Sequence, residues 1–189
     1  MKNNTVVNLA KLLKVLVIAA FVCNLLAFFF VPGMAMMKGP EELLELEPYA
    51  NPLELPLRLL ITFALAWVWV WQSGGYEIVL TLFLLLCGCC TAVMLWQAKR
   101  VLNTILAGET FSLENARNMK RAAFCCLLIA AAALIRLIWG LIFYQSIRPL
   151  LTYNALFVPV FAMGFLLFMV MSALFRQAAE MKAENDLTI

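Results

Sequence analysis

Polar residues divide the sequence into four long apolar segments with short charged stretches between them. These segments cover residues 9–32, 76–98, 122–146 and 152–176. A helix needs roughly 20 residues to cross a hydrocarbon core of about 30 Å, and each segment reaches that length. The pattern predicts an all-α membrane protein with four transmembrane helices, forming a single integral membrane domain over residues 1–189.

The stretch from Leu55 to Trp71 is ambiguous. Pro56 and Arg58 stand near its start, and it ends in tryptophans that alternate with valines. A period of two is typical of a strand, whereas tryptophan also favours the headgroup level of a membrane. This stretch is therefore interpreted as a short strand or an interfacial helix within a small extracytoplasmic segment, residues 33–75; a re-entrant segment and a fifth span stay open.

The basic residues favour an even number of spans. With four spans and the N-terminus inside, only three lysines or arginines fall outside, namely Lys38, Arg58 and Arg148. A fifth span weakens this asymmetry, and cytoplasmic segments carry the excess of basic residues. We therefore expect both termini in the cytoplasm, with a cytoplasmic loop at 99–121 and a tail at 177–189. The first apolar segment, which exceeds the roughly 7–15 residues of a cleaved signal, is interpreted as a retained anchor.

The loop between the second and third segments carries helix-boundary signals. Gly108 is typical of the end of a helix, and Ser112 is a favourable N-cap for the next one. Glu114 then falls in the first turn, where the helix dipole favours an acid. Phe111, just before the cap, is expected to pack back against the helix.

Composition argues against catalysis. The chain is 65% hydrophobic and 13% charged, with no histidine, so the commonest general base and metal ligand are both missing. It has no nucleophile elbow, phosphate-binding loop, zinc-binding motif or dinucleotide fingerprint. We expect a protein that is not an enzyme and that holds no cofactor and no metal.

Arg136 is the outstanding charge inside the third apolar segment. A charge at the bilayer centre costs about 2.5–3.5 kcal/mol on insertion scales, so it needs a partner or a wet cavity. Glu77 is a candidate partner, as are Tyr144, Gln145 and Asn154. Arg136 and Glu77 are therefore candidates for ligand binding or gating, against the alternative that Arg136 only snorkels toward the headgroups.

The run from Cys87 to Cys90 resembles a metal or redox motif but lies inside an apolar segment without histidine or nearby acids. Thiolates in hydrocarbon would be costly, and cysteine behaves there as a small packing residue. Helix packing is therefore the favoured interpretation of all six cysteines.

Two segments on the predicted cytoplasmic side carry residues that a simple anchor does not need. The loop holds Gly108, Phe111, Glu114 and Asn115, and the chain ends with Glu184, Asp186, Leu187, Thr188 and Ile189. The acidic tail and the basic loop residues Arg117, Lys120 and Arg121 pair with each other or else bind a partner. In the second case Leu187 and Ile189 would serve as apolar anchors on an extended strand.

These two motifs resemble those of a bacterial membrane family catalogued as domain of unknown function 2975. The resemblance implies four spans, a G-x-x-F-x-x-E-N loop and a terminal E-x-D-L-T-I, in the bacterial cytoplasmic (inner) membrane. It implies no defined activity, but members are often encoded beside a small helix-turn-helix regulator, an association rather than a physical argument.

The favoured function is a regulatory or sensor partner of a cytoplasmic protein, such as that regulator, without direct contact to nucleic acid. An outward-facing ligand-binding or self-protection protein is the first alternative, and a small transporter subunit is the second. Besides the lipid bilayer and a cytoplasmic protein, a homo-oligomer is compatible with the sequence.

Overall fold

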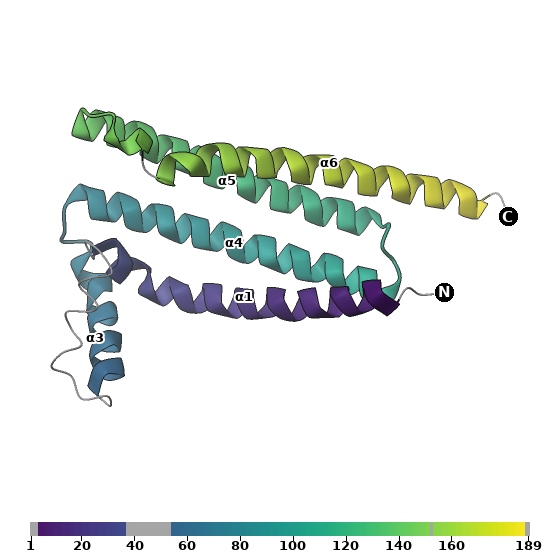
Figure 1. The fold of residues 1–189 in the computed structure, drawn as a ribbon, viewed down its shortest axis with the longest axis horizontal. Helices are drawn as coiled ribbons and strands as arrows, with labels where there is room; N and C mark the ends of the chain where they lie inside the picture. The colour runs from purple at the N-terminus through teal and green to yellow at the C-terminus, as the bar shows by residue number, and fades with distance from the viewer. Residues whose placement is uncertain (1–3, 37–53, 152, 188–189) are drawn as a thin grey trace. The chain divides into compact units, whose positions relative to one another are not determined.

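The part of the protein that the structure describes is almost entirely helical (Figure 1). The computed structural model describes residues 4–36, 54–151 and 153–187. The elements are α1 (Asn4–Met36), α3 (Glu54–Trp69), α4 (Gly75–Ala107), α5 (Leu113–Tyr144), the 3-10 turn η1 (Arg148–Leu151) and α6 (Tyr153–Leu187).

Four of these helices are long and apolar enough to cross a membrane: α1, α4, α5 and α6. The described residues contain no strand, so the predicted all-α class with four spans is confirmed. Most of their large apolar side chains are exposed, as expected where lipid replaces water around the protein. The protein is a multi-pass membrane protein.

The helices are longer than the apolar segments that predicted them. α4 has 33 residues and α6 has 35. At 1.5 Å per residue such a helix measures about 50 Å, well beyond a core of about 30 Å. The extra turns hold the polar residues that follow each apolar segment, so a span and its adjoining polar segment form one continuous helix.

The chain forms two compact units. Unit 1 comprises Met1–Asn24 with Cys89–Ile189, and unit 2 comprises Leu25–Gly88. The expectation of one domain over residues 1–189 stays a prediction.

In unit 1, α5 is the most closely packed helix, and α6 runs beside it (Figure 1). Its buried side chains are mainly small, including Ala122, Ala123, Ala130 and Ala133. Gly164 of α6 lies against Cys126, where an added methyl group would come within 3.4 Å of the sulfur. Small residues let helix backbones approach closely in lipid, where the hydrophobic effect supplies no attraction between helices.

The first part of α1 packs on the second part of α4 within the same unit. Ala10 and Val17 of α1 form a buried cluster with Leu102 of α4. Phe21 and Trp96 extend this contact, with ring centroids 5.9 Å apart.

In unit 2, the tryptophan-rich stretch is the helix α3, so its interpretation as a strand was wrong. The buried residues Phe63, Ala66 and Val70 recur at helical spacing. Phe63 packs edge-on against Phe30 of α1, with centroids 4.8 Å apart, and Trp67 Nε1 donates a hydrogen bond to the Phe29 carbonyl. Contacts with α1 therefore override the local period of two. With 16 residues, α3 falls short of the roughly 20 needed for a span.

Gly33 of α1 has no room for a side chain, because a methyl group there would overlap the Phe63 ring. We expect Gly33→Ala to destabilise the protein by about 1–3 kcal/mol through overpacking, which outweighs the gain in helix propensity of roughly 1 kcal/mol. The measurement is the thermal unfolding midpoint in detergent. Gly75→Ala is the matched control, because nothing lies within 4 Å of its added methyl group. Equal midpoints for the two variants would show that the α1–α3 contact is loose.

Candidate functional site

The candidate site lies in unit 1, at the connection between α4 and α5. It comprises residues 108–112 with the adjoining turns of α4, α5 and α6, and is called the loop end below. α4 ends as the sequence predicts, with Gly108 at a φ of +89°. The Gly108 N–H donates to the Ile105 carbonyl, and the Glu109 N–H donates to the Thr104 carbonyl at 2.9 Å. Because few side chains tolerate a positive φ, glycine is favoured at this position.

α5 begins as predicted with Ser112 as its N-cap. Ser112 has an extended backbone, and its hydroxyl accepts a hydrogen bond from the Asn115 N–H at 3.2 Å. Glu114 lies in the first turn and is exposed. The local sequence signals therefore define both sides of the turn.

The Asn115 side chain closes the loop from inside. It is 0% exposed, and its Nδ2 donates to the Thr110 carbonyl at 2.8 Å. The Thr104 Oγ1 lies 2.8 Å from Asn115 Oδ1 and 2.7 Å from the Val101 carbonyl, so its single proton serves one of these oxygens at a time. One amide thus ties the loop backbone to the last turns of α4. Asn115 therefore positions the loop, and its candidate role in partner docking stays a prediction.

Phe111 is the large apolar residue that the closed loop exposes. Its side chain is 53% exposed, and its ring centroid lies 6.2 Å from that of Phe175 in α6. The Ser172 hydroxyl of α6 donates to the Ala116 carbonyl of α5 at 2.7 Å. Phe111 therefore contacts α6 as well as the loop, and the loop end joins α4, α5 and α6.

Charged side chains lie on the turns of α5 and α6 that follow Phe111 and Phe175. Arg117, Lys120 and Arg121 are exposed on α5, and their spacing of three and four residues puts them on one helix face. Arg176 and Glu180 form an ion pair at 2.8 Å within α6, exposed on both sides. Exposed pairs of this kind contribute little to stability.

The C-terminal motif continues α6 instead of forming an extended strand. The helix runs to Leu187, so the extended interpretation is wrong for that part, and the Glu184 side chain is exposed. The backbone of Asp186 and Leu187 is helical, but the structure does not describe their side chains. Thr188 and Ile189 lie outside the described residues.

The two gating candidates belong to different units. Arg136 is half-buried in α5 of unit 1, and Glu77 is half-buried in the first turn of α4, in unit 2. Their pairing therefore stays a prediction. Asn154, an alternative partner, has no described side chain, whereas Tyr144 and Gln145 end α5 and are exposed.

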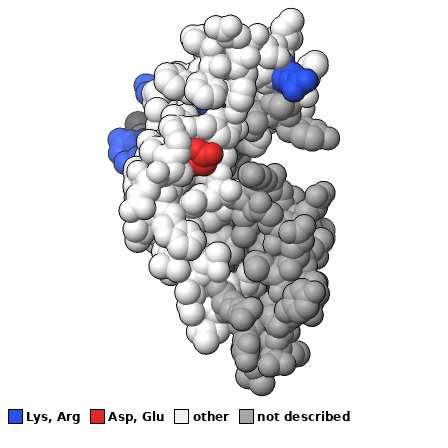
Figure 2. All heavy atoms as spheres, turned by 90° about the vertical axis from the view of Figure 1, so that its left-hand side faces the viewer, with Lys and Arg blue, Asp and Glu red and all other residues white. Residues whose placement is uncertain are grey.

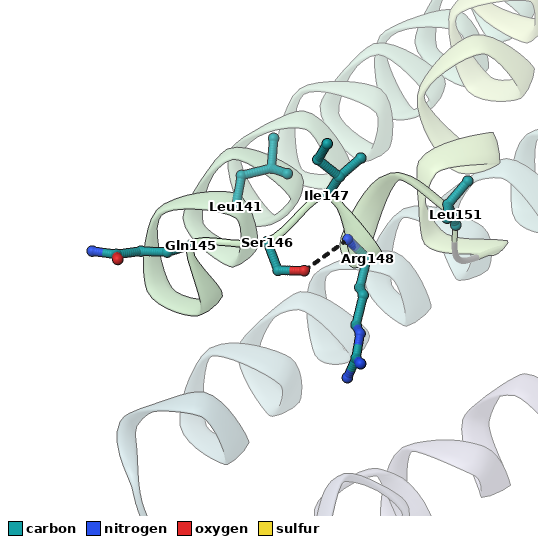
Figure 3. A pocket seen from close by; sticks show the side chains of 6 residues that line it. All are labelled: Leu141, Gln145, Ser146, Ile147, Arg148 and Leu151. Carbon is teal, nitrogen blue, oxygen red and sulfur yellow. Dashed lines mark hydrogen bonds between the residues drawn. The ribbon is translucent and has the colours of Figure 1, made fainter.

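An open hollow of about 610 Å³ lies at the opposite end of α5, at its connection to η1 (Figure 3). Gln145, with a φ of 45°, reverses the chain there, and the Arg148 N–H donates to the Ser146 hydroxyl. In Figure 3 the Gln145 and Arg148 side chains point in different directions, so they do not converge on a ligand. Figure 2 shows the side that lies at the left of Figure 1, where most of the described side chains are uncharged.

Three cysteines of unit 1 lie in the seam between α4 and α5, whereas Cys23 and Cys89 of the same unit are exposed. Cys90, Cys125 and Cys126 are buried, and Cys126 Sγ lies 3.9 Å from Met94 Sδ. In the part of the chain that the structure describes, no three cysteines or acids are grouped to hold a metal ion. None of the six cysteines forms a disulfide.

Sequence reasoning missed Thr104 and Ser172 as partners of the loop end. Thr104 stands eleven residues before Asn115, across the turn, and a threonine in an apolar helix carries no local sign of a distant partner. The one available signal in the sequence was that Thr104 and Asn115, both polar, stand on either side of the predicted turn.

The family model described as "Protein of unknown function (DUF2975)" matches residues 45–189, more than half of the chain. The chain belongs to this family. No curated protein and no solved structure matches it. The matched range includes the whole loop end, and the family resemblance expected from the loop and tail motifs is confirmed.

Replacing Asn115 tests the closure of the loop. Asn115→Ala leaves the Thr110 carbonyl and the Thr104 hydroxyl without their buried partner, which we expect to cost about 1–3 kcal/mol. The measurements are the thermal midpoint in detergent and the rate of protease cleavage within 108–112, which should rise. Asn103→Ala, at an exposed position of α4, is the control and should change neither. Unchanged cleavage in Asn115→Ala would contradict the closure.

Proposed function

We propose that this protein is a membrane-embedded partner that binds a cytoplasmic protein at its loop end. The observation that supports this proposal most is the exposure of Phe111 on a loop fixed by buried hydrogen bonds. A large apolar side chain on a fixed loop between two helix ends is suited to binding, because little conformational entropy is lost when a partner covers it. Leu113, 50% exposed, adds a second apolar contact.

The charges around Phe111 suit an acidic partner surface. Arg117, Lys120 and Arg121 have no ion-pair partner among the described residues. Aromatic anchors carry much of the energy of protein interfaces, whereas surrounding charges mainly govern encounter and orientation. The same basic residues favour the cytoplasmic side for the loop end.

The partner class comes from the family resemblance: a small helix-turn-helix regulator encoded beside the gene. Such a regulator needs its basic face for DNA, so an acidic or apolar face would be the one that meets the loop end. Holding it at the membrane would keep it from its operator. The membrane protein itself would then regulate transcription without touching nucleic acid.

Phe111→Ala tests this function directly. We expect recovery of the tagged neighbouring regulator with the purified membrane protein to fall about tenfold, as for the loss of roughly 1.4 kcal/mol from an interface. Phe143→Ala is the matched control, because Phe143 is 61% exposed at the opposite end of α5. The measurement is the ratio of regulator to membrane protein after detergent solubilisation.

Membrane abundance must stay equal in both variants, so that a folding defect is not mistaken for a lost contact. A chain ending at residue 184 provides an independent variant that leaves the loop untouched. If the regulator is recovered equally with Phe111→Ala, Phe143→Ala and the shortened chain, it does not bind here.

A further inference from the structure

Two buried amides lie in the helix seam above the loop end without a complete set of hydrogen bonds. Gln97 of α4 is 7% exposed and Asn118 of α5 is 1% exposed. Gln97 Oε1 and Asn118 Nδ2 have no hydrogen-bond partner among the described residues. An unpaired buried polar group costs about 1–3 kcal/mol in proteins, so each amide calls for a ligand.

Both amides face the seam between α4 and α5. Gln97 stands seven residues before Thr104, which contacts Asn115 of α5, so the two share one face of α4. Asn118 follows Asn115 by three residues and shares one face of α5.

Two contacts across the seam define how far apart the two amides lie along it. Thr104 contacts Asn115 below them, and Met94 contacts Cys126 above them. The two helices run in opposite directions, and every residue advances each helix by the same rise. Counted from either contact, Gln97 and Asn118 therefore lie about 5–8 Å apart along the helix axes. Packed helix axes lie about 8–10 Å apart, so two amides offset along the axis can be bridged by a small molecule between them.

The free atoms define the chemistry of the ligand. Gln97 Oε1 accepts a hydrogen bond and Asn118 Nδ2 donates one. A ligand between them must donate on one side and accept on the other. An anion would meet the Gln97 oxygen and a cation the Asn118 amide hydrogens, so the site disfavours ions. Water has the required chemistry, and buried waters commonly bridge such groups.

We propose that Gln97 and Asn118 form a buried site for a small neutral hydrogen-bonding ligand, normally water, in the α4–α5 seam. This site is separate from the exposed surface around Phe111 and does not depend on the proposed partner.

Hydroxyl-radical footprinting of the full chain in lipid nanodiscs tests the site. Radiolysis of bound water oxidises the side chains beside it, even where bulk solvent is excluded. Met94 precedes Gln97 by one turn on the same face and reports on the site through its sulfoxide. Met163 of α6 is the lipid-facing control, with 62% of its side chain exposed in the protein alone. We expect Met94 to be oxidised several-fold faster than Met163.

The double variant Gln97→Leu with Asn118→Leu removes both polar groups. Oxidation of Met94 should then fall to the level of Met163, while Met181 near the end of α6 should keep its rate. If Met94 resists oxidation in the unmodified protein, the amides bond directly or the seam is dry, and the proposal is wrong. Undiminished oxidation in the double variant would also overturn it. If the double variant does not fold, the comparison of Met94 with Met163 still decides.

Discussion

One buried amide, that of Asn115, governs the turn between α4 and α5. Its Nδ2 holds the Thr110 carbonyl, and its Oδ1 lies 2.8 Å from the Thr104 hydroxyl. Without these bonds the Thr110 carbonyl would lose its hydrogen-bond partner within the protein. Because the turn is fixed, Phe111 keeps its exposed position beside Phe175, and the seam above the turn keeps its register.

Above the turn, packing rests on small side chains more than on large ones. α5 buries alanines, cysteines and a glycine against its neighbours, while its leucines and isoleucines are mostly exposed. This inverts the arrangement of a water-soluble bundle, since lipid solvates large apolar groups as well as a protein core does. Close approach leaves little space in the seam, so polar residues there, such as Gln97 and Asn118, must find their partners within it.

The sequence predicted those features that depend on local chemistry. The four spans follow from apolar length, and the turn at Gly108 and the cap at Ser112 follow from backbone preferences that few residues share. Prediction from the sequence was wrong or incomplete where contacts between residues far apart in the chain determine the local structure. The tryptophan alternation suggested a strand, but Phe63 of α3 packs on α1 and fixes a helix. The contact between Asn115 and Thr104 was also missed, because nothing in the neighbourhood of Asn115 reveals that Thr104 faces it. The pairing of Arg136 with Glu77 depends on how the two units meet, which neither helix dictates.

The account requires the loop end to face the cell interior. The most direct measurement is the reaction of a membrane-impermeant maleimide with a single added cysteine, Glu109→Cys, at an exposed position of the loop. The unmodified chain is labelled in parallel to measure the reaction of its native cysteines. We predict that the added cysteine is protected in intact cells and reacts fully once the membrane is opened. Rapid labelling in intact cells would put the loop on the outer side and contradict binding of a cytoplasmic partner there.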